Sequence, residues 1–228
     1  RSVVASAYKA GYTEIVLKCK KMPMLEKINE IVNSFTGLEI TAQTKDTITI
    51  KSFLTAENAD IENLIIKMFQ IINVLFETII EEETLDLKSI STMVRTNVRK
   101  LRDHCLRSIH LNNYGGDLSY DYYDLVTQLE KIAVGLYYMA EYRAGNKHMQ
   151  TLFMTKAQIL FEESYRAYLK KEFVFATACA LKEREESEKT CNPKTLAKIC
   201  MKNPEVVYYY EIMMRLRQLN SRIISLSS

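Results

Sequence analysis

The scarcity of turn-forming residues is the strongest constraint on the fold of this chain. Only six glycines and three prolines occur among 228 residues, far below the average usage of these two residue types. Glycine and proline supply most of the backbone conformations that reverse a chain. The sequence therefore predicts long helices with few connections and argues against a β-rich enzyme. The hydrophobic content of 47% is enough for one large core or two modest ones.

Strand character is confined to residues 12–53. Alternating, β-branched segments occupy residues 13–19, 38–43 and 47–51, and the last two flank a short hairpin connection. Between the first and second, residues 22–35 place apolar side chains at helical spacing, and Gly37 stands where that helix would end. We therefore expect the order β-α-β-β.

Beyond residue 60 the apolar residues recur with a helical period of about 3.6 residues. The predicted helices cover about 60–83, 87–109, 119–144, 147–169, 171–188 and 205–226. Breakers separate them: Asn112 to Gly116, Gly145-Asn146, Asn192-Pro193 and Asn203-Pro204. The pattern indicates three helices followed by three more.

Long amphipathic helices with short connections pack antiparallel, because the next helix is the nearest cover for each apolar stripe. The expected fold class is α+β, predominantly α. A small αβ domain is expected at 1–56 and a helical domain at 57–228. The helical domain is predicted to contain two antiparallel three-helix bundles, at 60–144 and 147–226.

Charge and cysteine content point to no specialised chemistry. Lysine and arginine total 31 against 28 acidic residues, so the net charge of +3 implies no nucleic-acid partner by itself. The five cysteines form no CxxC pair, which fits a reducing cytoplasm. No apolar run is expected to approach the roughly 20 residues that are needed to span a bilayer. We therefore expect a cytoplasmic protein without membrane insertion.

Three segments resemble the archaeal-type phosphate-uptake regulators, the PhoU-like family. They are AYKAGYTEI at residues 7–15, FTGLEITAQT at 35–44 and ITIKSFL at 48–54. The helical segments VTQLEKIA at 126–133 and 214–223 resemble the family's bundle helices more weakly. The resemblance implies a small αβ element before a helical PhoU domain, and it covers nearly the whole chain.

The resemblance also implies partners. Many family members carry an AbrB-type DNA-binding domain upstream, and the start at Arg1 fits the removal of such a domain. Nucleic acid is then expected only through that upstream domain. A homodimer is expected, together with contacts to phosphate-transport or signalling proteins.

The family's metal-binding chemistry is expected to be lost. Relatives carry pairs of acids one helical turn apart that hold iron or zinc clusters. The positions that align with these pairs here are Arg95 and Arg99 on the second helix, Glu130 and Val134 on the third, and Met214 and Gln218 on the last. No metal site and no cofactor is predicted, although Glu130 is retained.

Arg95, Arg99 and Glu130 are the candidate site residues. They can be surface charges, an interhelical salt bridge that replaces the metal, or an anion site. The acids Glu183, Glu185, Glu186 and Glu188 on the fifth helix are assigned to a solvated face, with metal ligation as the other reading.

The remaining polar residues suggest structural roles. His104, His110 and His148 have no matched acid or cysteine at ligand spacing. The tyrosines at 120, 122, 123, 137, 138 and 208–210 are expected at a bundle seam rather than around a ligand. No nucleophile and base can be paired and no nucleotide-binding motif occurs, so no enzyme activity is predicted. A regulator acting through protein contacts is the first hypothesis, and a metal-sensing or metal-storing bundle is the alternative.

Overall fold

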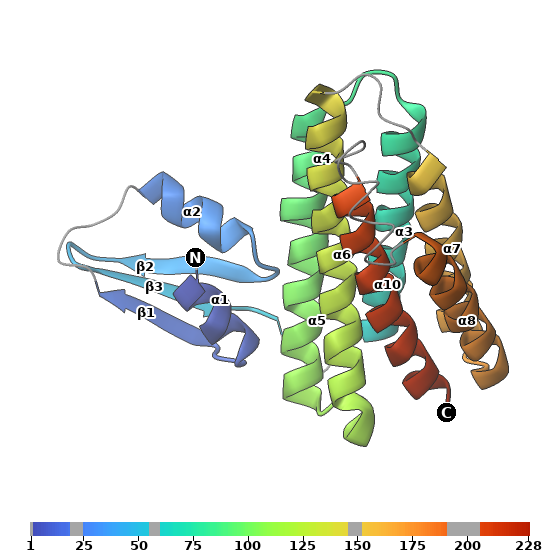
Figure 1. Cartoon of the computed structure of the whole chain (residues 1–228). Helices are drawn as coiled ribbons and strands as arrows, with labels where there is room; N and C mark the ends of the chain where they lie inside the picture. The colour runs from blue at the N-terminus through green and yellow to red at the C-terminus, as the bar shows by residue number, and fades with distance from the viewer. Residues whose placement is uncertain (1, 19–24, 55–59, 146–151, 191–205) are drawn as a thin grey trace.

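The computed structural model describes residues 2–18, 25–54, 60–145, 152–190 and 206–228. The protein is predominantly helical with a small three-stranded antiparallel sheet, which confirms the expected fold class at that level. Figure 1 shows the sheet and its two helices beside a group of longer helices. Pro193, Pro204 and His148 lie outside the described residues.

The first part of the chain forms an αβ unit. Its elements are α1 (Ser2–Lys9), β1 (Glu14–Lys18), α2 (Leu25–Asn33), β2 (Leu38–Gln43) and β3 (Thr47–Ser52). The strand order is β1-β3-β2, with β3 antiparallel to both neighbours. The predicted β-α-β-β order is therefore confirmed. Helix α1 before it was not predicted.

The αβ unit has a hydrophobic core of its own. Tyr8 of α1 lies against Phe35, with ring centroids 5.1 Å apart, and the inward residues Ile48 and Ile50 of β3 are fully buried. The predicted stop at Gly37 has a physical reason. Its φ is +71°, and a Cβ there would lie 2.4 Å from the Leu54 side chain, so this turn requires glycine.

The helical part follows the predicted pattern of long elements. It comprises α3 (Ile61–Glu81), α4 (Leu87–Thr92), the π-helical turn η2 (Met93–Val98), α5 (Arg99–Asn112), the short η3 (Gly116–Leu118), α6 (Ser119–Gly145), α7 (Leu152–Lys170), α8 (Phe173–Thr190) and α10 (Val206–Ser227). Asp60 and Asp86 cap the starts of α3 and α4 by accepting bonds from backbone amides. Asn113, with φ of +46°, ends α5 in the left-handed conformation.

The long helices share one continuous hydrophobic core, to which α3, α5, α6, α7, α8 and α10 all contribute. Helix α10 packs against α6, α7 and α8. The predicted division into two bundles, and the boundary at residue 56, stay predictions.

One described helix, α3, is long and apolar enough to cross a membrane by length and composition. No helix of this kind was predicted from the sequence. The apolar residues of α3 from Ile61 to Ile79 supply much of the core.

The single helix predicted at 87–109 contains an irregularity. The segment is helical from Leu87 to Asn112, but Met93–Val98 adopts π-helical hydrogen bonding between α4 and α5. Such turns insert one extra residue into a helix and occur often at functional sites. Arg95 lies inside this turn and Arg99 directly follows it.

The αβ unit is attached to the bundle through α5. The buried guanidinium of Arg107 donates from Nη1 to the carbonyl oxygens of Tyr8 and Tyr12, at 2.6 and 3.2 Å. The same guanidinium lies 4.9 Å from the centroid of the Tyr8 ring. Lys100 adds a bond to the carbonyl of Asn33 at 3.2 Å. Figure 1 shows the αβ unit beside α5. Nothing in the sequence predicted this attachment.

Candidate functional site

Helix α6 lies between α5 and α10 and presents carboxylates to both. Glu130 faces α5, whereas Asp121 and Asp124 face α10. Each of these carboxylates is bound by arginine from the neighbouring helix. We call these contacts the α6 arginine ties.

The first tie joins α5 to α6. Oε1 of Glu130 accepts a bond from Arg99 Nε at 3.1 Å and lies 3.1 Å from Nη1 of Arg102. Arg102 also donates to Oδ1 of the buried Asp103, at 3.0 and 2.7 Å. Two guanidinium groups thus face two carboxylates, so the cluster is electrically balanced. Only about a tenth of the Glu130 side chain is exposed, which strengthens these interactions relative to surface pairs.

The structure separates Arg95 from this cluster. Its guanidinium lies over the ring of Tyr137, with Cζ 4.9 Å from the ring centroid. Tyr137 and Glu130 are two helical turns apart on the same face of α6. Of the three candidate residues, only Arg99 and Glu130 therefore lie together. Arg102 was not predicted to join this site, although its position one helical turn after Arg99 pointed to it.

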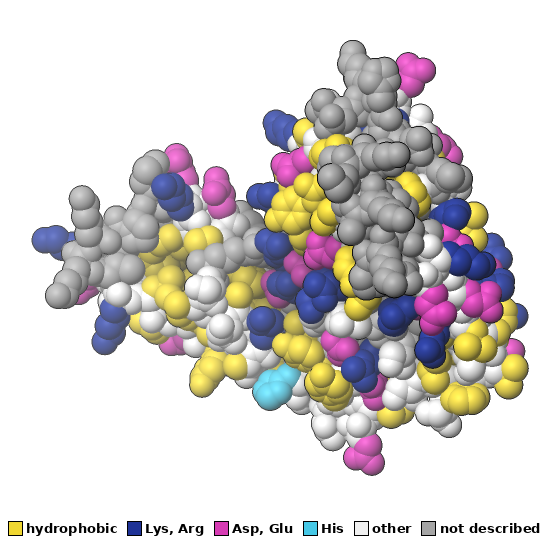
Figure 2. Space-filling view, in the orientation of Figure 1, with side chains coloured by type: hydrophobic (Ala, Val, Ile, Leu, Met, Phe, Trp, Pro, Cys, Tyr) yellow, Lys and Arg dark blue, Asp and Glu magenta, His cyan; other side chains and the backbone are white. Residues whose placement is uncertain are grey.

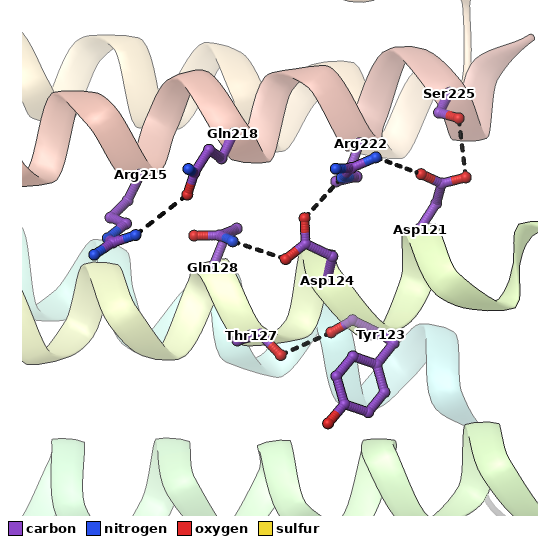
Figure 3. A network of polar contacts seen from close by, with 9 residues as sticks. All are labelled: Asp121, Tyr123, Asp124, Thr127, Gln128, Arg215, Gln218, Arg222 and Ser225. Atoms are coloured by element: carbon purple, nitrogen blue, oxygen red, sulfur yellow. Dashed lines mark hydrogen bonds and ion pairs between the residues drawn. The ribbon is translucent and has the colours of Figure 1, made fainter.

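The second tie joins α6 to α10, as Figure 3 shows. Arg222 donates from Nε to Asp124 at 2.7 Å and from Nη1 to Asp121 at 3.0 Å. Ser225 donates to the other oxygen of Asp121 at 3.0 Å. Hydrogen bonding with Asp124, and then Asp121, raises the pKa of Arg222 above its usual value.

Met214 and Gln218 on α10 were predicted, from the resemblance alone, to stand where a metal-binding pair of acids would lie, and neither side chain binds an acid among the described residues. Met214 is partly buried, and Gln218 is exposed and accepts a bond from Arg215 at 3.3 Å. On α6, Gln128 donates to Asp124 at 2.8 Å (Figure 3). Val134 packs against the hydrophobic core. These positions therefore serve packing and hydrogen bonding.

A further carboxylate, Glu62 at the start of α3, accepts hydrogen bonds from three tyrosine hydroxyls. Tyr114, Tyr122 and Tyr168 donate to it at 2.9, 3.3 and 2.6 Å, and Lys171 adds an ion pair at 2.8 Å. Burial alone would raise the pKa of Glu62, but the bonds from Lys171 and the tyrosines together hold it below its usual value. Tyr122 thus uses its hydroxyl inside the protein, in a hydrogen bond to Glu62.

The acids of α8 differ from the predicted solvated face. Glu183 is only 1% exposed, whereas Glu185 and Glu188 are exposed as expected. Glu186 is half-buried and pairs with Lys156 at 2.6 Å. Glu183 lies 3.5 Å from Nε of Arg217 on α10. Burial raises the pKa of Glu183 despite the opposing charge of Arg217. The assignment to a solvated face is therefore wrong for Glu183, because α10 covers that side of α8.

In the described ranges, the histidines and cysteines form no metal-binding cluster. Burial, followed by the charge of Arg107, lowers the pKa of His104, and His110 is exposed. Burial raises the pKa of Cys105 to about 12, which makes this thiol unreactive. Within the part of the chain that the structure describes, no group of three or more His, Cys, Asp or Glu residues is arranged to hold a metal ion.

No family model, no curated protein and no solved structure matches this chain.

Proposed function

We propose that this protein is a non-enzymatic regulator related to the PhoU-like family. In this proposal it acts in the cytoplasm through protein contacts, either in phosphate-transport signalling or in phosphate-responsive transcription. The support comes from the family-like segments at 7–15, 35–44 and 48–54, and from a small αβ unit followed by long helices with a shared core.

The α6 arginine ties oppose metal binding at Glu130. A carboxylate binds a metal through the same oxygen lone pairs that accept hydrogen bonds from arginine. In Glu130, Oε1 is held by Arg99 and Arg102. A metal at this position would have to displace partly buried guanidinium groups and leave them without a countercharge, which is costly. Arginine therefore performs here the linking role that metal clusters perform in the family.

Protein contacts are supported by exposed apolar residues at the turn between α7 and α8. Leu169, Phe173 and Val174 are 49%, 51% and 80% exposed. Neighbouring exposed apolar side chains often mark association surfaces. A homodimer or a partner protein would cover them, and nucleic acid would be reached through an upstream domain.

Disruption of the gene in its natural host tests this proposal. Phosphate uptake and transcripts of the phosphate-transport genes are measured in phosphate-rich and phosphate-poor medium. We expect both to lose their response to phosphate, and the intact gene to restore it. An unchanged response in the disrupted strain would refute a role in phosphate regulation.

Elemental analysis of the purified protein separates this proposal from the metal-sensing alternative. We expect iron and zinc far below one ion per chain, both as isolated and after incubation with either metal and desalting. Stoichiometric retention of either metal would favour the alternative.

A further inference from the structure

Helices α8 and α10 enclose a surface cleft of about 430 Å³. Its lining includes Thr177, Leu181 and Glu183 from α8 and Arg217, Ser221 and Ile224 from α10. The volume falls within the range of about 300–1,000 Å³ that is typical of small-molecule sites. None of the α6 arginine ties contributes to this lining.

Glu183 brings an unused acceptor to the cleft. Its Oε2 is 3.5 Å from Nε of Arg217, a long contact for a charge-assisted hydrogen bond. Its Oε1 is buried and has no hydrogen-bond partner, and the same is true of Oγ1 of Thr177. An unpaired buried acceptor costs free energy. A donor that reached Oε1 would recover that cost.

Arg217 offers the complementary group. Its side chain is 43% exposed, and its contact with Glu183 involves Nε alone. The guanidinium fork is suited to binding a carboxylate through two parallel hydrogen bonds. Glu183 and Arg217 thus place an acceptor and a donor for a charged ligand side by side.

The charges of the cleft cancel. Glu183 and Glu188 balance Arg184 and Arg217, and Arg184 also pairs with Glu188 at 2.9 Å on the exposed rim. A neutral site of this kind has no net attraction for a simple cation or anion. It favours a ligand that carries one positive and one negative group close together.

The remaining walls are aliphatic. Ala180 and Leu181 on α8 and Ile224 on α10 line the cleft, and Leu181 is 56% exposed. Aliphatic walls around a few convergent polar groups are the usual composition of small-molecule sites. They would cover a short branched hydrocarbon side chain.

We infer that the cleft between α8 and α10 binds a small aliphatic α-amino acid, with its ammonium on Glu183 and its carboxylate on Arg217. The two charged groups of an α-amino acid are separated by a single carbon atom, which suits two side chains in contact. The hydrocarbon side chain lies against Leu181 and Ile224. This inference concerns an effector site and does not depend on a role in phosphate regulation.

Isothermal titration calorimetry of the whole chain with L-leucine, L-valine and L-alanine tests the inference. We expect saturable heat at ligand concentrations up to about 10 mM. Glu183→Gln should weaken binding by about tenfold or more, because a neutral amide replaces the charge that pairs with the ammonium. Glu185→Gln is the matched control, since this exposed acid lies outside the cleft and should leave affinity unchanged.

Ligand analogues test the same contacts without altering the protein. N-acetyl-L-leucine lacks the ammonium and L-leucinamide lacks the carboxylate, so both should bind at least about tenfold more weakly than L-leucine. Absence of heat with all three amino acids would overturn the inference. Binding of either analogue as tight as that of L-leucine, or equal affinity for L-leucine in Glu183→Gln and Glu185→Gln, would also overturn it.

Discussion

Acids pair with arginine both in the seam around α6 and in the cleft between α8 and α10. The ion pairs of Arg222 in the seam are short, whereas the pair in the cleft is long and leaves one carboxylate oxygen without a hydrogen bond. Arg222 binds Asp121 and Asp124 at 3.0 and 2.7 Å. Glu183 meets Arg217 at 3.5 Å and keeps one oxygen without a partner. Buried charges stabilise a fold only when their hydrogen bonds are complete. The arginine contacts around α6 therefore link helices, whereas Glu183 in the cleft can still accept a hydrogen bond from a ligand.

Removal of the Glu130 side chain should give the largest loss in the free energy of unfolding. Glu130→Ala leaves Arg99 and Arg102 partly buried against α6 with Asp103 as the remaining acid. We expect the free energy of unfolding to fall by about 2–3 kcal/mol, as measured by urea denaturation.

Glu14→Ala is the control for that experiment. Its ion pair with Lys51 is about half exposed on both sides, so the loss should be below about 1 kcal/mol. Equal losses in the two variants would show that the tie between α5 and α6 contributes no more than a surface pair.

Replacement of Arg222 tests the other side of α6. In Arg222→Met, Asp121 and Asp124 lose their shared partner while the aliphatic packing is kept. We expect a loss of about 1–2 kcal/mol. The loss should shrink at high salt, because screening weakens attraction in the native protein and repulsion between the two acids in the variant. A loss independent of salt would indicate that packing dominates.

The pH dependence of stability should have opposite signs at Glu62 and Glu183. The pKa of Glu62 is lowered from 4.5, so its contribution is complete above pH 4.5 and is lost as the pH falls through its folded-state pKa. The pKa of Glu183 is raised from 4.5, so the folded protein holds this proton more tightly. Its ionisation therefore costs stability as the pH rises above 4.5.

Two glutamine variants make this comparison measurable. Thermal or urea unfolding between acidic and neutral pH should show that Glu62→Gln removes part of the acid-side loss. Glu183→Gln should remove part of the loss on rising pH, so that it gains stability relative to the wild type towards neutral pH. Parallel pH curves for both variants and the wild type would contradict the assignment.

The rim pair of the cleft should give the smallest effect. Arg184 and Glu188 are 69% and 64% exposed. Glu188→Gln should change the free energy of unfolding by no more than about 0.5 kcal/mol. A larger loss would show that the rim stabilises the cleft more than its exposure suggests.

Local patterns in the sequence predicted most of the architecture. The long helices follow from apolar periodicity and rare breakers, and the strands follow from alternation. Helix α1 was missed because an eight-residue helix offers too few turns for periodicity to show. The π-helical turn was also missed, because hydrogen bonding of this kind depends on what the helix packs against.

Pairing within the candidate site was predicted only where a motif suggested it. Arg99 and Glu130 were connected through the family's acid positions, whereas Arg222 with Asp121 and Asp124 had no such guide. The burial of Glu183 could not be anticipated, because acids at 183, 185, 186 and 188 resemble a solvated face along the chain. The covering helix α10 begins only at Val206, so burial at Glu183 is a tertiary property.

The π-helical turn at Met93–Val98 determines how α5 is rotated about the helix axis relative to α4. If Met93–Val98 were wound as an ordinary α-helix with no residue removed, α5 would be rotated by about 100° relative to α4. Arg107 would then lose its contacts with Tyr8, and Arg99 would lose its hydrogen bond to Glu130. The wide turn thus absorbs one surplus residue, and in the resulting phase α5 presents Arg107 to the αβ unit and Arg99 to α6.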